Sequence, residues 1–153
     1  MLRYISEGEV HKDFHGLTCA TLHYLIDNYG HDSVREIMHN TACKVYKTIH
    51  EKLEKGDCSE LLEYWEYYLK RENGSFSIEK VDDAIRLIVK DCPALRHLVK
   101  LEQQPDKILC EATRIFNDAL CENTPFFIET ECTGDFSCVQ ILKKKECNSN
   151  AAK

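Results

Sequence analysis

The sequence lacks the segments that carry a protein into a membrane or onto a nucleic acid. It contains no apolar run of about 18 residues, the length that crosses a bilayer, and residues 1–7 lack the apolar segment of a signal peptide. The net charge of −6 leaves no broad basic surface to oppose a phosphate backbone. At 153 residues the chain is the size of one domain. We therefore expect a cytoplasmic protein with no membrane partner and no nucleic-acid partner.

The motifs of several common protein classes are missing as well. The sequence has no glycine-rich loop that would cradle phosphates, no serine elbow with its acid and base, and no EF-hand loop. It also lacks the CxxC spacing of a zinc knuckle and the HExxH spacing of a zinc protease. Nucleotide and phosphoryl chemistry are therefore disfavoured.

Cysteine, by contrast, is abundant. Nine cysteines are unusual for a cytoplasmic protein, because thiols stay reduced in that compartment and disulfides are rare there. The odd number also argues against a closed disulfide framework. In a reducing compartment cysteines serve as small buried apolar residues, as metal ligands or as nucleophiles. The function of the chain depends on which of these roles its thiols have.

The hydrophobic pattern predicts a single α+β domain over residues 1–146 and a disordered polar tail at 147–153. Apolar residues at helical spacing predict helices at residues 11–29, about 32–53, 60–71, 93–101 and 105–121. Alternating apolar residues predict two hairpins, with strands at residues 75–78, 84–89, 126–132 and 137–142. We expect the N-terminal helices to pack mainly on one side of a roughly four-stranded antiparallel sheet made of the two hairpins.

The helix predicted at residues 105–121 has a thiol and polar stripe beside its apolar face. Cys110, Thr113, Asn117 and Cys121 fall within about 80° of one another around the helix axis. Such a stripe is typical of a helix that lines a pocket, which makes Thr113 and Asn117 candidate substrate-binding residues. The alternative is a half-exposed helix face on which the cysteines are incidental.

The second hairpin adds Glu129, Cys132 and Cys138, which together with Cys110 have the ligand chemistry of a tetrahedral zinc site. In a regular strand Glu129 and Cys132 point to opposite faces, so both bind one ion only if the strand twists or bulges. The alternative is that these cysteines pack as apolar residues in a small sheet.

Cys92 stands immediately before the first turn of a predicted helix that begins at Pro93. Backbone N–H groups and the helix dipole at such a position favour a thiolate. Cys92 is therefore a candidate nucleophile or ligand, with a simple junction residue as the alternative. His97, one turn further on, can return to the same site as a base or ligand.

Histidines recur at four-residue intervals near the N-terminus, at His11, His15 and His23, with Cys19 between them. Neighbouring members share a helix face, which is the spacing of a known zinc arrangement. Without a matching acid we expect them at the solvent edge of the helix. His15 is kept as a candidate substrate-binding residue.

The run from Glu129 to Ile141 resembles the closing hairpin of 4-vinyl reductase-type small-molecule-binding domains. In that family a helix cysteine, a Glu-x-x-Cys pair and a final cysteine hold zinc beside an apolar ligand pocket. The resemblance implies that Cys110 is the helix ligand, that Glu129 and Cys132 form the Glu-x-x-Cys pair, and that Cys138 is the closing ligand.

A longer span, from Phe14 to Cys138, resembles the bacterial L-2-amino-thiazoline-4-carboxylic acid hydrolase-like family. The resemblance rests on Phe14-His15-Gly16, Cys92-Pro93, Cys110 in its helix, and Gly134-Asp135-x-x-Cys138. It implies hydrolytic opening of a small cyclic amidine ring to an N-carbamoyl amino acid.

Two main functions follow as expectations. In a hydrolase, Cys92 or Cys110 would be the nucleophile or a ligand, and His97 or Glu129 would move protons. In a non-catalytic sensor or carrier, zinc would brace the hairpin against the helix beside an apolar ligand. A plain interaction domain is the third option. The expected partner is a small-molecule ligand or substrate, and a homodimer is kept open.

Overall fold

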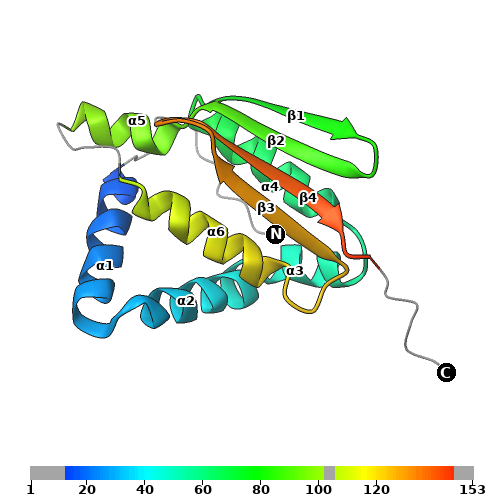
Figure 1. Cartoon of the computed structure of the whole chain (residues 1–153), viewed down its shortest axis with the longest axis horizontal. Helices are drawn as coiled ribbons and strands as arrows, with labels where there is room; N and C mark the ends of the chain where they lie inside the picture. Colours follow the sequence, from blue (N-terminus) through cyan, green and yellow to red (C-terminus); the bar gives the residue numbers. More distant parts are fainter. Residues whose placement is uncertain (1–12, 102–105, 147–153) are drawn as a thin grey trace.

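The computed structural model describes residues 13–101 and 106–146 and has the predicted α+β fold. The helices are α1 (Asp13–Tyr29), α2 (His31–Asn40), α3 (Lys47–Glu54), α4 (Ser59–Arg71), α5 (Pro93–Lys100) and α6 (Ile108–Leu120), and a π-helical turn, η1 (Thr41–Val45), lies between α2 and α3 (Figure 1). The strands are β1 (Ser75–Val81), β2 (Ala84–Asp91), β3 (Phe126–Cys132) and β4 (Cys138–Lys144). No helix within the described ranges has the length and apolar content to cross a bilayer. The tail predicted at residues 147–153 lies outside these ranges, as does His11.

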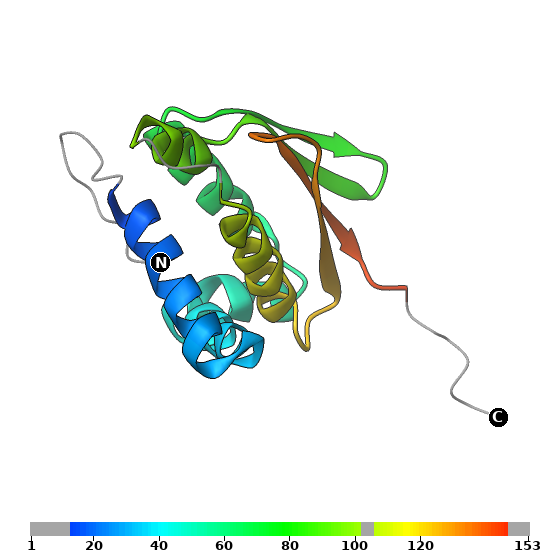
Figure 2. The same ribbon diagram turned by 60° about the vertical axis from the view of Figure 1, so that its left-hand side comes forward.

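The four strands form one antiparallel sheet in the order β1-β2-β4-β3, which confirms the prediction of a sheet made of two hairpins. The β2–β4 pairing joins the two hairpins. Helices cover one face of this sheet, as the two views show (Figures 1 and 2). Ile128 and Leu142 pair across β3 and β4, and both are buried on the helix side of the sheet.

The helix predicted at about residues 32–53 is divided into α2, η1 and α3. The backbone N–H of Tyr46 donates to the carbonyl of Thr41, five residues back, which is the hydrogen bond of a π turn. The turn directs the Tyr46 ring toward Tyr64 and Phe116, with ring centroids 5.1 and 5.0 Å away. This break in the helix therefore supplies an aromatic side chain to the interior.

Buried apolar residues form two clusters that meet at one end of the sheet. The first lies under the sheet and includes Trp65, Leu87 and Leu120. The second lies between α1, α5 and α6 and includes Leu98. Cys92 packs against both clusters, so it marks the place where they join. Burial of each of these leucine side chains contributes roughly 1.5–3 kcal/mol to the stability of the fold. This packing holds the elements around the junction in place.

Candidate functional site

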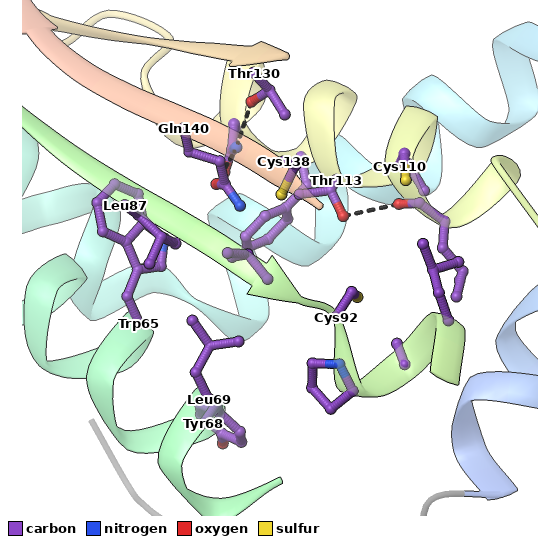
Figure 3. Close-up of a pocket in the computed structure, with 18 of the residues that line it drawn as sticks. Trp65, Tyr68, Leu69, Leu87, Cys92, Cys110, Thr113, Thr130, Cys138 and Gln140 are labelled. Atoms are coloured by element: carbon purple, nitrogen blue, oxygen red, sulfur yellow. Dashed lines mark hydrogen bonds between the residues drawn. The ribbon is translucent and has the colours of Figure 1, made fainter. Parts of the chain in front are cut away.

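A cavity of about 380 Å³ lies between the sheet and the helices, at the junction of the two clusters (Figure 3). Its size is within the range of roughly 300–1,000 Å³ that is usual for small-molecule sites. Much of its wall is aromatic, with contributions from α1, α4, α6 and Tyr46, the residue after η1. The aromatic lining residues are Phe14, Tyr46, Tyr64, Trp65, Tyr68 and Phe116.

Four cysteines from separate parts of the sequence line this cavity: Cys92, Cys110, Cys132 and Cys138. Figure 3 shows three of them on different elements, with Cys92 before α5, Cys110 on α6 and Cys138 on β4. The structure therefore brings together the thiols that the sequence analysis selected from the helix and the hairpin, and it adds Cys92 to them.

The tip of the β3–β4 hairpin explains why these thiols meet. The backbone N–H of Cys92 donates to the carbonyl of Phe136 at 2.7 Å. The Lys107 ammonium donates to the carbonyls of Gly134 and Asp135 at 3.0 and 3.3 Å. These bonds hold the hairpin tip against the beginnings of α5 and α6, next to Cys92 and Cys110.

Burial holds the thiols of Cys110 and Cys138 in the protonated form. Burial raises the pKa of Cys110 to about 12, and a hydrogen bond with Cys132 adds to the increase. Burial likewise raises the pKa of Cys138 to about 11, with smaller contributions from Cys92 and Cys132. A thiol rather than a thiolate is a poor nucleophile and a poor metal ligand.

Cys92 shows how two opposing effects balance at a helix start. The backbone N–H groups of Leu95 and Ala94 contact its thiol and lower its pKa, which is the effect expected at this position. Burial is the larger effect, and the net result is a raised pKa. The expectation that the helix start makes Cys92 a thiolate is therefore not met in this environment.

Glu129 lies apart from the four thiols. The β3–β4 register runs without a shift from Phe126 to Cys132, so Glu129 points to the outer face of the sheet, opposite to Cys132. Its carboxylate is exposed and lies 2.6 Å from the Lys143 ammonium. Within residues 13–101 and 106–146, no three His, Cys, Asp or Glu side chains are placed to hold a metal ion. The set of Cys110, Glu129, Cys132 and Cys138 does not fit zinc in this arrangement.

Two predicted substrate-binding residues of α6 do line the cavity. The side-chain amide of Asn117 donates to Thr130 Oγ1 at 3.0 Å and to Gln140 Oε1 at 2.8 Å, and so connects α6 with β3 and β4. The Thr113 hydroxyl donates to the Leu109 carbonyl at 2.8 Å. Cys121, on the same predicted stripe, is buried outside this cavity.

His15 also lines the cavity, together with Glu72, a residue that the sequence analysis did not select. Their Nε2 and Oε2 atoms lie 2.8 Å apart, and both residues are buried. Glu72 is the residue after the last turn of α4, where the helix dipole disfavours a negative charge. Its position next to a histidine of another helix arises only in the folded chain.

His97 lies behind His15 rather than on the cavity wall. The two ring centroids are 6.3 Å apart, and His97 Nε2 is 3.6 Å from the Asp13 carboxylate. This nitrogen is buried and has no hydrogen-bond partner among the described residues. The structure therefore places His97 near the site without bringing it into contact with the cavity.

No protein-family model matches the sequence, and no curated protein matches it.

Proposed function

We propose that this protein binds a small, mainly apolar molecule in the cavity between the sheet and the helices. The observation that carries the proposal is the aromatic wall around a cavity of about 380 Å³. Apolar area removed from water contributes about 25 cal/mol per Å², so a ligand that fills this space gains most of its affinity from the rings. Trp65, Tyr64 and Phe116 supply part of that surface.

Two polar groups interrupt the apolar wall and would orient the ligand. One is the Asn117 amide network that joins α6 to the hairpin, and the other is the His15–Glu72 pair between α1 and α4. A few polar groups at defined positions in an apolar site are the usual source of specificity. The protonated thiols belong to the apolar part, because a neutral cysteine behaves as a small apolar side chain. Binding in this form does not depend on zinc.

Energy transfer from tryptophan to a bound probe tests this proposal. Trp65 is the single tryptophan, is 4% exposed and lines the cavity. We expect 1-anilinonaphthalene-8-sulfonate to quench Trp65 emission as it binds. Thr113→Phe narrows the cavity and should weaken probe binding by about tenfold or more, which corresponds to about 1.4 kcal/mol.

The matched control is Thr21→Phe, which places the same side chain on the exposed face of α1 and should leave the affinity unchanged. Near-ultraviolet circular dichroism of both variants reports whether the fold is retained. Equal probe affinity for folded Thr113→Phe and for the parent protein would contradict a site in this cavity.

Hydrolysis is the second candidate, and one observation favours it. Cys92 lines the same cavity as the buried His15–Glu72 pair, so a sulfur, a base and a group that orients the base occur at one site. The raised pKa of Cys92 means that His15 would have to accept the thiol proton as the sulfur attacks.

If the protein is a hydrolase of this kind, it should open the ring of L-2-amino-thiazoline-4-carboxylate with water. Chromatography of the N-carbamoyl product measures the reaction. Cys92→Ala should abolish product formation, with a loss on the order of a hundredfold or more. Cys43→Ala, outside the cavity, should retain it. Product formation that survives Cys92→Ala would exclude the sulfur as nucleophile.

A further inference from the structure

The β3–β4 hairpin, which lines part of the cavity, places two cysteines directly opposite each other. Cys132 and Cys138 are the last residue pair of the β3–β4 ladder. The next pair outward is joined by a hydrogen bond from the Thr133 N–H to the Ser137 carbonyl at 3.0 Å. Hydrogen-bonded and non-hydrogen-bonded pairs alternate along an antiparallel ladder, so Cys132 and Cys138 form a non-hydrogen-bonded pair.

This position has the backbone geometry that a disulfide needs. Cα atoms of a non-hydrogen-bonded pair are about 4.5 Å apart, and their side chains approach more closely than at other positions. Disulfide-linked residues have Cα atoms about 4.4–6.8 Å apart. The pair is therefore within bonding range without movement of either strand.

The two thiols differ in their access to solvent. Both line the cavity, but Cys132 is exposed whereas Cys138 is half-buried. An oxidant in solution therefore reaches Cys132 first and finds Cys138 beside it. An exposed cysteine next to a second, resolving cysteine is the arrangement of a redox-sensitive pair.

We propose that Cys132 and Cys138 are a reversible dithiol–disulfide pair at the mouth of the cavity, with hydrogen peroxide as the oxidant. The Cys132 thiol first gives up its proton to solvent, and the resulting thiolate attacks one peroxide oxygen. The O–O bond breaks, and the leaving hydroxide takes up a proton to become the first water, which leaves a sulfenic acid at Cys132. The Cys138 sulfur then attacks the Cys132 sulfur, the S–O bond breaks, and the leaving hydroxide takes the Cys138 proton to become water. In total, two thiols and one peroxide give one disulfide and two waters, with two electrons passing from sulfur to oxygen.

Cys110 is the competing partner, because its thiol forms a hydrogen bond with that of Cys132. One fact favours Cys138. The backbone ladder fixes the distance between Cys132 and Cys138, whereas Cys110 belongs to a separate helix.

Disulfide mapping of the full-length protein tests the proposal. The reduced protein, kept in a chelator so that no metal ion protects the thiols, is treated with stoichiometric hydrogen peroxide and its remaining thiols are alkylated. Digestion with trypsin and with a protease that cleaves before Asp135 separates the two cysteines unless a disulfide joins them. We expect a Cys132–Cys138 cross-linked peptide as the main product, and dithiothreitol should restore both thiols.

Cysteine-to-serine variants show which sulfur atoms form the disulfide and which one reacts first. Cys132→Ser should remove the cross-link, and it should slow the first loss of a thiol by about tenfold. Cys121→Ser, on the same proteolytic fragment as Cys132 but buried outside the cavity, should leave the cross-link unchanged. A main cross-link from Cys132 to Cys110 would overturn the assignment. So would oxidation of Cys132 to sulfinic acid while Cys138 remains open to alkylation.

Discussion

Raising the pH from 8 to 10 is expected to lower the free energy of unfolding by about 2 kcal/mol. The cause is a group of thiols whose pKa burial raises from 9.0. The largest increases are at Cys19, Cys121 and Cys138, each to about 11, and at Cys110, to about 12. Burial also raises the pKa of Cys43 and of Cys92. Between pH 9 and 11 the unfolded chain releases these protons and the folded chain keeps them, so stability falls as the pH rises. The expected change is reduced for solvent screening, because the thiols are only partly buried.

Urea unfolding under reducing conditions at pH 7, 8, 9 and 10 measures this effect. We expect a nearly constant transition below pH 8 and a progressive fall above pH 9. Replacing both Cys110 and Cys138 with alanine should remove a large part of the pH dependence, because these are two of the four thiols with the largest increases in pKa. A transition that is independent of pH up to 10 in the parent protein would contradict the burial of these groups.

Cys110 is expected to react with iodoacetamide about a thousandfold more slowly in the folded protein than in the unfolded chain. Its pKa of about 12, against 9.0 for an unperturbed thiol, lowers the thiolate fraction near pH 8 by about that factor. Limited access within the folded protein acts in the same direction.

Mass spectrometry of alkylated peptides follows Cys110 over time at pH 8, with the urea-unfolded protein as the internal reference. A rate in the folded protein within about tenfold of the reference would show that Cys110 ionises nearly as readily as an ordinary thiol. Such a result would restore Cys110 as a candidate nucleophile, and it would contradict an apolar role for this thiol.

Local patterns in the sequence were enough to find the thiol and polar part of the cavity wall, but not its aromatic part. The helical spacing of Cys110, Thr113 and Asn117 placed them on one face of α6, and alternation along the second hairpin gave β3 its observed bounds. These inferences succeeded because helix and strand periodicity are properties of neighbouring residues. Cys121 differs because it follows the last turn of α6 and is buried among other side chains.

The remaining features depend on contacts between distant segments. Glu72 and His15 are 57 residues apart in sequence, and nothing near Glu72 indicates its partner. The π turn before Tyr46 leaves the apolar pattern of the helix almost unchanged. The pKa of Cys92 depends on both the backbone N–H groups at the helix start and the burial of the thiol. The burial comes from side chains that are distant in the sequence, so it could not be predicted from the residues next to Cys92.

For Glu129 the sequence allowed either a regular strand or a strand with a bulge. The sequence showed that Glu129 and Cys132 face opposite sides of a regular strand, and only a bulge could have joined them. Regular pairing of β3 with β4 excludes that bulge within the described ladder, and Lys143 pairs with the Glu129 carboxylate on the outer face.

The most direct test of the ligand-binding cavity is a two-dimensional ¹⁵N–¹H NMR titration with 1-anilinonaphthalene-8-sulfonate. We expect the largest shifts at the Trp65 indole N–H, at the side-chain amides of Asn117 and Gln140, and at the backbone of Thr113. The outer face of the sheet also carries half-buried apolar side chains, at Phe127, Val139 and Ile141. Shifts confined to those residues, with the Trp65 signal unmoved, would contradict a ligand site in the cavity.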